Sequence, residues 1–479
     1  MNSFRKFASP LFLVFGEGIL LSGVLLAVYL GGLTARAEEA GGPLPETVPA
    51  PESPAIPPEQ VLDPPSTALL PAVPALPAPS ALPTLPHETS GLQMELPADS
   101  LPASSRPVRP WRVDIGLETS VTYDDNIFIQ HVNRQSDVYF GATPIAMLTL
   151  GKPMPAAQTL TGTISRFFRP VDPNEPGNSF ALRYSPTASF FVHHSDQNAF
   201  DEDVTLNGRL RTEKTLLEFE ARYQTLSSPD LDVGNRINRS VYTAYGDLIY
   251  NLTNKTSVES RLDFNHTSYE GGLNFTDIGE RVTLDYKVAP KTSIGIGGAI
   301  GYTDVESGFN QLYEQGLIHI HYVPTHKITL DLLAGVEVRE IDGASTRTTP
   351  VFELNATYAA QESTALILTV SRRTEPSAIF QGQDIDRTTV EANIRQLFFQ
   401  KVYVTVGGGY QHAEYVDAGL STGTADRTDD FGYVGISAAT ELTKWCSMRM
   451  GYRYQDNRST QDDFAFRRDI ADVQFNLKF

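Results

Sequence analysis

Histidines at short spacing are the first residues in this chain that could do chemistry. His319 and His321 flank Ile320, so on a β-strand both imidazoles would face the same way and could share a metal ion. The same spacing also fits two polar side chains lining a hydrated interior, and this interpretation is favoured. Two more histidines and an aspartate occur at 193–196, at a predicted strand end, where loop polarity explains them better than a catalytic set.

The acidic loop around Asp230 and Asp232 faintly resembles a calcium loop. Gly234 comes one position too early for an EF-hand, and Val241 stands where the bidentate glutamate belongs. A solvated acidic loop is therefore predicted, with divalent ions held between loops and an anionic surface as the alternative. The chain contains no Gly-x-Ser-x-Gly elbow, zinc spacing or phosphate-binding glycine loop. No enzyme, metal site or cofactor is expected.

The elements that must position these side chains are alternating strands. In the segment 473–479 (VQFNLKF), apolar and polar residues alternate up to Phe479, and about 18 such segments follow Trp111. A period of two predicts half-buried strands. Charged residues on nearly every polar face, with no helical pattern between segments, favour a closed barrel with a wet interior over a solvated sandwich.

The first 110 residues have a different organisation. Arg5 and Lys6 precede an apolar run at 11–33 and the small-residue site Ala35-Arg36-Ala37, which predicts a signal peptide over 1–37; a retained helix is the alternative. Residues 38–110 are predicted to be a disordered linker, because 19 of the 32 prolines lie between 41 and 110. The linker is interpreted as a spacer or as a docking site for an envelope or cell-wall partner. The single cysteine, Cys446, excludes an intrachain disulfide, and the net charge of −19 argues against nucleic acid.

Loop lengths support the barrel prediction for residues 111–479. Tight turns, such as 212–214 and 290–292, alternate with long loops, such as 227–238 and 417–430. Short periplasmic turns and long outer loops are typical of outer-membrane barrels, whose strand number is even. We therefore predict an all-β, transmembrane antiparallel barrel of about 18 strands, with 16 as the alternative, and with both ends periplasmic. Residues 152–178 break the rule and are interpreted as an insertion, although 159–168 could form another strand.

The polar faces of these strands define a predicted lumen of mixed charge. Such a mixture predicts weak ion selectivity, or a wall locked by pairs on neighbouring strands. Acidic outer loops predict a mild preference for cations at the entrance. The predicted lumen-lining residues are Arg183, Arg209, Arg222, Arg261, Asp263, Asp285, Asp331, Glu337, Arg339, Arg395, Arg449 and Arg453.

Three segments carry a resemblance to a known family: 120–127 (SVTYDDNI), 184–186 (YSP) and the terminal VQFNLKF. The run from Trp111 to Phe479 resembles the putative β-barrel porin family of Gram-negative envelopes. This resemblance implies an outer-membrane location, contact with lipid and lipopolysaccharide, and a channel for small polar solutes or saccharides. It also implies that barrel-assembly machinery reads Phe475 and Phe479. The alternative is a structural or polysaccharide-export accessory barrel that binds an envelope partner through its proline-rich segment.

Overall fold

The computed structural model describes residues 111–151, 177–306, 310–325, 327–344, 346–361, 363–377, 379–380, 382–417 and 427–479. The predicted signal peptide, the proline-rich linker and most of the 152–178 insertion lie outside these residues. None of the helices within the described ranges is long and apolar enough to cross a membrane.

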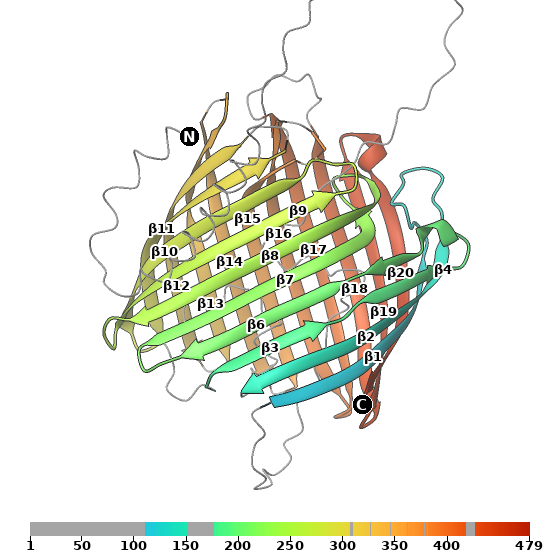
Figure 1. The fold of residues 1–479 in the computed structure, drawn as a ribbon, viewed down its shortest axis with the longest axis horizontal. Helices are drawn as coiled ribbons and strands as arrows, with labels where there is room; N and C mark the ends of the chain where they lie inside the picture. Colours follow the sequence, from blue (N-terminus) through green and yellow to red (C-terminus); the bar gives the residue numbers. More distant parts are fainter. Residues whose placement is uncertain are drawn as a thin grey trace, which may run out of the picture. The chain divides into compact units, whose positions relative to one another are not determined.

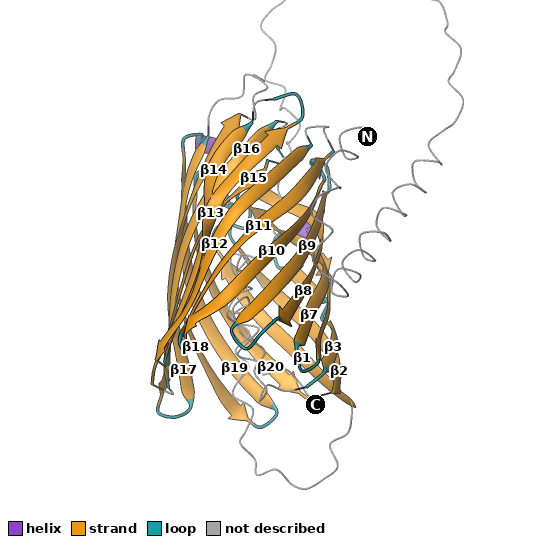
Figure 2. Ribbon diagram, turned by 90° about the vertical axis from the view of Figure 1, so that its left-hand side faces the viewer, coloured by secondary structure: helices purple, strands orange, loops and turns teal. Residues whose placement is uncertain are grey.

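The alternating segments form one continuous antiparallel sheet (Figure 1). It contains twenty strand segments, and the only helices in the described ranges are two short 3-10 turns, η4 (Ser195–Gln197) and η5 (Asp462–Phe464) (Figure 2). The strands are β1 (Trp111–Asp124), β2 (Asp137–Gly151), β3 (Ser179–Tyr184), β4 (Thr187–Phe191), β5 (Ala199–Asp201), β6 (Asp203–Arg211), β7 (Thr215–Asp230), β8 (Asn235–Asn251), β9 (Thr256–Tyr269), β10 (Phe275–Ala289), β11 (Thr292–Val305), β12 (Gln311–Thr325), β13 (Ile328–Ile341), β14 (Arg347–Gln361), β15 (Thr364–Pro376), β16 (Gln383–Phe398), β17 (Val402–Asp417), β18 (Thr428–Thr443), β19 (Cys446–Ser459) and β20 (Phe466–Lys478).

The sheet closes on itself, because β1 pairs with β2 on one side and with β20 on the other. Two barrel strands are each interrupted once. Pro186 has no N–H to donate and separates β3 from β4, while Glu202 separates β5 from β6. β2 pairs with both β3 and β4, so these segments count as one strand, as do β5 and β6. The barrel thus has 18 strands, which confirms the predicted number and its even parity.

The insertion does not alter the order of the strands. Gly151 at the end of β2 is in register with Ser179 at the start of β3, so no strand separates them in the sheet. The possible strand at 159–168 lies outside the described residues. Short turns, such as 290–291, gather at the mouth where β1 begins and β20 ends, as does the connection at 152–178, and the other longer loops gather at the opposite mouth. We call these the short-turn mouth and the long-loop mouth.

One predicted loop is much shorter than expected. The sequence indicated a loop over 227–238, but β7 continues to Asp230 and β8 starts at Asn235. The intervening polar residues extend the ladder, with Ser228 opposite Ile237 and Thr225 opposite Ser240. Beyond the apolar band a strand no longer needs an apolar face, so the loss of alternation there did not mark a turn.

The two faces of the wall differ in exposure as the alternation predicted. On β11 and β12 the outward residues Ile296 and Ile318 are 62% and 55% exposed. The inward residues Glu259 on β9 and His319 on β12 are 3% and 1% exposed. Tyr286, Tyr322 and Tyr358 also face outward, near the short-turn mouth, and are 49%, 40% and 43% exposed. An apolar outer band bordered by aromatic residues around a polar interior is the arrangement that a bilayer requires of a barrel.

Candidate functional site

The inner wall is held together by ion pairs between neighbouring inward side chains. Arg209 on β6 lies 2.7 Å from Glu218 on β7, and both are almost fully buried. Arg449 on β19 lies 3.0 Å from Asp472 on β20. The predicted alternative in which charges lock neighbouring strands therefore has a structural basis in this wall.

Other inward charges pair along a single strand. Arg261 lies 2.7 Å from Asp263 on β9, and Arg339 lies 2.8 Å from Glu337 on β13. Residues two apart point to the same face of a strand, which brings these guanidinium and carboxylate groups together. Arg222 on β7 pairs instead with Asp203 on β6, at 2.6 Å.

The remaining predicted lumen residues are placed as follows. Arg183 on β3 and Arg453 on β19 alternate with exposed outward neighbours and therefore face inward. The Arg395 guanidinium lies 5.4 Å from the centre of the Tyr403 ring. Asp285 and Asp331 each contact a histidine of β12. Whether any of these side chains meets a passing solute stays a prediction.

The two histidines of β12 contact separate carboxylates rather than a shared ion. His319 Nε2 lies 2.9 Å from Asp285 Oδ1, and His321 Nδ1 lies 2.5 Å from Asp331 Oδ1. The first contact crosses the intervening strand β11 at Gly295, where a Cβ would lie 2.2 Å from His319 Nε2 and 2.3 Å from Asp285 Oδ1. Glycine therefore makes this contact possible. Within the described ranges, no group of three or more histidine, cysteine or acidic residues could hold a metal ion.

Tyr313 of β12 also crosses β11 over a glycine, at a position nearer the long-loop mouth. Its ring lies over Gly301 of β11, where a Cβ would lie 2.1 Å from Tyr313 Cζ. Its hydroxyl reaches Asp277 on β10 at 3.3 Å, and Asp277 also accepts a 2.7 Å hydrogen bond from Thr303 Oγ1. The Arg339 guanidinium stacks on the other side, 4.9 Å from the ring centre. These residues line an interior cavity of about 250 Å³.

The other chemistry candidates of the sequence contact protein groups at the long-loop mouth. His193 Nδ1 and His194 Nδ1 lie 3.1 and 2.8 Å from the Asp137 carboxylate. Asp230 pairs with Arg239 at 2.9 Å, and Asp232 pairs with Arg427 at 3.2 Å. The acidic loop thus contributes to ion pairs within the protein.

Arg427 links two distant parts of this mouth. Its Nη1 and Nη2 groups donate hydrogen bonds to the carbonyls of Asp232 and Leu231, at 2.7 and 2.8 Å. The guanidinium lies 3.5 Å from the centre of the Phe464 ring and 4.3 Å from that of Tyr415. Arg427 also pairs with Asp429, two residues along the chain. Nothing in the local sequence identified its role at the mouth, because its other partners come from β17 and from loops far along the chain.

Apolar side chains from opposite walls also meet across this end of the lumen. Tyr269 of β9 packs with Ile385 of β16 and with Ala413 and Tyr415 of β17. A second cluster joins Ile129 of the β1–β2 loop to Phe431 of β18 and Phe466 of β20, with Leu231 and Tyr433 packed against it. The long-loop mouth is therefore crossed by packed side chains, and it is narrower than strand number alone would give.

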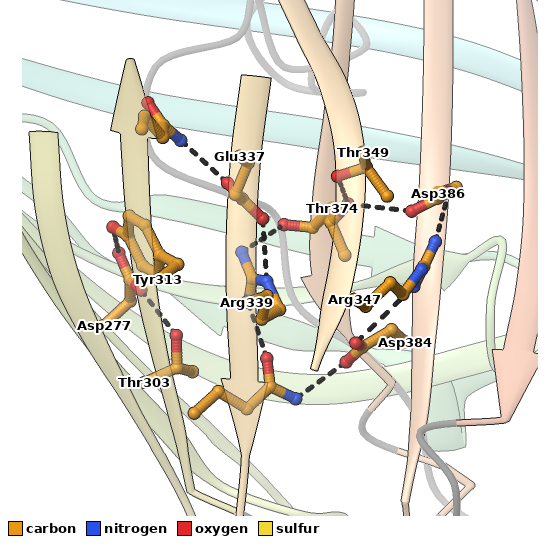
Figure 3. A network of polar contacts seen from close by, with 12 residues as sticks. Asp277, Thr303, Tyr313, Glu337, Arg339, Arg347, Thr349, Thr374, Asp384 and Asp386 are labelled. Carbon is orange, nitrogen blue, oxygen red and sulfur yellow. Dashed lines mark hydrogen bonds and ion pairs between the residues drawn. The ribbon is translucent and has the colours of Figure 1, made fainter. Parts of the chain in front are cut away.

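A large part of this closure comes from the end of the β15–β16 hairpin. We call residues 373–377 and 382–387 the β15–β16 tip. β15 pairs with β14 only as far as Phe352 opposite Arg372, although β14 begins at Arg347 and β15 ends at Pro376. Beyond that point the tip separates from β14 and contacts the inner face of β12, β13 and β14 (Figure 3).

Polar contacts hold the tip against this inner face. Gln311 Nε2 donates a 2.7 Å hydrogen bond to Asp384 Oδ1, and Arg347 pairs with both Asp384 and Asp386. Arg339 Nη2 donates a 3.2 Å hydrogen bond to the Thr374 carbonyl. Figure 3 shows Arg347 between the two carboxylates and Thr349 beside Thr374. Asp384 and Asp386 are 0% and 4% exposed.

No family model and no curated protein matches the chain. Among solved structures it is similar to Acinetobacter baumannii OccAB4, with 12% identity, a TM-score of 0.40, and coverage of 77% of this chain and 98% of that one. It is also similar to the outer membrane protein OpdK from Pseudomonas aeruginosa, with 10% identity, a TM-score of 0.39, and coverage of 77% and 99%. A bacterial polysaccharide outer membrane secretin shares 8% identity, with a TM-score of 0.32 and coverage of 76% and 98%.

These likenesses concern the fold alone, and the structure itself supplies the remaining evidence. A closed, even-numbered antiparallel ladder with an apolar outer band satisfies every backbone group inside lipid. The chain folds as an outer-membrane β-barrel. At 18 strands, the barrel belongs to the size class that encloses an aqueous channel unless part of the chain fills it. Among the residues that the structure describes, the tip and the clusters around Arg427 narrow its long-loop mouth.

Proposed function

We propose that the barrel is an outer-membrane channel for passive passage of small polar solutes, saccharides among them. The observation that carries this proposal is the charged inner wall of a closed 18-stranded barrel. Its arginines and carboxylates are mostly paired, so the wall offers hydrogen-bond donors and acceptors with little excess of either charge. Such a wall suits hydroxyl-rich solutes and gives weak ion selectivity.

The proposed orientation follows from the two mouths. Short turns and both ends of the barrel lie on one rim, which we assign to the periplasm by the rule for outer-membrane barrels. The long-loop mouth, with the tip and Arg427, then faces the cell exterior. The linker would lie in the periplasm.

Planar-bilayer recording of the mature chain tests this function, in parallel with a variant that lacks residues 38–110. We expect discrete conductance steps from both forms, with a modest preference for cations in a salt gradient. A clear preference for anions would contradict the predicted entrance. If neither form conducts current at any applied voltage, free diffusion through the barrel is excluded.

The packed long-loop mouth favours a second candidate function. A barrel with a filled lumen could serve as a structural or polysaccharide-export accessory protein that binds an envelope partner through residues 38–110. Pull-down from envelope extracts, with and without these residues, separates the two functions. A partner that no longer binds after the deletion, together with a silent barrel, would support the accessory function.

A further inference from the structure

The sequence alternation of the β15–β16 tip does not match the side of the wall on which its residues lie. Along β16 the even-numbered residues Val390 and Ile394 face outward and are 38% and 47% exposed. Asp384 and Asp386 continue this even-numbered set, yet both are buried against inward residues of β12 and β14. By alternation along β16, Asp384 and Asp386 belong to the outward-facing set, yet both lie inside the barrel.

The same mismatch occurs on β15. Leu366, an even-numbered residue, is 37% exposed on the outer surface. Thr374 belongs to that set, but its hydroxyl lies 3.4 Å from that of Thr349, an inward residue of β14. A tip displaced from the line of the wall into the lumen accounts for both strands at once.

The displacement leaves a split between two strands that are otherwise paired. The β14–β15 ladder stops at Phe352 and Arg372. Beyond it, residues 347–351 and residues 373–376 do not pair with each other, although both ranges are in strands. Extending the register from Phe352 and Arg372 would place Pro350 opposite Thr374. Pro350 and Pro376 each lack a backbone donor, so each removes a hydrogen bond that would hold this part of the ladder closed.

We propose that the β15–β16 tip is a gate with two arrangements, and this inference rests on the proposed channel function. In the closed arrangement, Arg347 and Gln311 hold Asp384 and Asp386 against the inner wall. In the open arrangement, the tip rejoins β14, part of the missing ladder forms, and the two carboxylates turn to the outer surface above the apolar band. The closed arrangement has the ion pairs and hydrogen bonds of the two carboxylates, and the open arrangement would have ladder hydrogen bonds between β14 and β15 instead. Two alternative sets of contacts are what a two-state element requires.

The opposite face of the tip explains what opening would change in the lumen. In the closed arrangement, Ile385 packs in one cluster with Tyr269 of β9, so the tip spans the space between distant strands. Movement of the tip toward β14 would withdraw Ile385 from Tyr269, whereas Tyr415 lies directly opposite Ile385 on the neighbouring strand β17. The charged side chains that hold the closed arrangement are distinct from the Arg209–Glu218 and Arg449–Asp472 pairs of the wall. Those wall pairs need not break when the tip moves.

A disulfide lock tests the gate in the full mature chain. In a Cys446→Ser background, the double variant Thr349→Cys and Thr374→Cys places two thiols where hydroxyls now lie 3.4 Å apart. The matched control is His266→Cys with Thr276→Cys, a directly opposed pair on the outer face of β9 and β10 that stays paired in both arrangements. Conductance is recorded in planar bilayers before and after reduction with dithiothreitol.

We expect the oxidised tip variant to lose most of its conductance and reduction to restore it, with no change in the control. Asp386→Asn in the natural background should give a several-fold higher open probability, because it weakens the closed arrangement without adding a cross-link. Failure of the tip disulfide to form, or equal conductance of the oxidised and reduced forms, would overturn the gate and leave the channel intact. Silence of every form, the control included, would overturn the channel and the gate with it.

Discussion

Arg427 and Asp232 are 195 positions apart in the sequence, yet Arg427 Nη1 lies 3.2 Å from Asp232 Oδ1. This contact joins the start of β18 to the β7–β8 loop across the long-loop mouth. Both side chains are buried, with exposures of 0% and 2%. A buried ion pair of this kind is costly to break on one side only, because the remaining charge is left without its partner.

The ionisation of Asp232 should make this contact depend on pH. Burial raises the pKa of the Asp232 carboxyl from 3.8 to about 7, while the Arg427 guanidinium opposes the shift. Tyr415, Asp230 and Arg387 also act on this carboxyl. With the loop open to water, the carboxyl would ionise near 3.8, so between 3.8 and about 7 the closed loop binds more protons than the open loop. The closed loop therefore becomes less stable relative to the open loop as pH rises through this window. Above the window its stability changes little.

Hydrogen exchange at the β7–β8 loop measures this effect. After correction for the intrinsic pH dependence of exchange, amides at 231–234 should exchange at least about tenfold faster at pH 8 than at pH 5, the change that one pKa unit represents. Asp232→Asn should remove the difference. An equal difference in the wild type and the variant would assign the pH dependence to another group.

Gly295 should be required for the Asp285–His319 contact. Alanine at this position would place a Cβ within 2.3 Å of both side chains and force them apart. Separating two buried polar groups that are in contact costs about 1–3 kcal/mol when both stay buried. Urea unfolding of the refolded barrel measures this cost, with Gly316→Ala as the control, since a Cβ at Gly316 has open space around it. Equal destabilisation by the two substitutions would mean that the contact contributes little.

Ile318 should report the position of the lipid band. It lies on the outer face of β12, opposite Ile296 of β11, and is 55% exposed. Arginine at a lipid-facing site near the bilayer midplane costs about 2–4 kcal/mol, and less toward the interfaces. We expect Ile318→Arg to lower the unfolding free energy in lipid vesicles by that amount, and Ile318→Leu to leave it nearly unchanged. A cost near zero would place this residue outside the membrane.

Phe479 should matter for assembly more than for stability. Its side chain is 76% exposed, and its backbone N–H donates a 2.9 Å hydrogen bond to the Ile115 carbonyl that any residue could make. Phe479→Ala should therefore refold in vitro with an unchanged midpoint but reach the outer membrane of cells in several-fold lower amounts. Phe479→Tyr is the control that keeps an aromatic end. Normal membrane levels of the alanine variant would remove the proposed assembly signal.

Several features of the barrel follow from its sequence alone. Alternation at a period of two assigned inward and outward residues, because a strand side chain has only two directions. The number of alternating segments gave the strand number. The order of tight turns and long loops gave its even parity, because antiparallel strands must return to the same mouth in pairs. The prediction of a loop over 227–238 was wrong. Strands that extend beyond the lipid no longer alternate apolar and polar residues, but they keep their hydrogen-bonded pairing.

The closed mouth was decided by tertiary structure alone. Period-two alternation places Asp384 and Asp386 on the outer face, and only the split between β14 and β15 brings them inside to Arg347. Arg427 finds Asp232 and Phe464 through strands that meet only when the barrel closes. The two faces of the wall could be predicted from the sequence, because each strand's faces depend on local spacing. Contacts across the lumen depend on closure, tilt and the path of the loops, which local spacing does not encode.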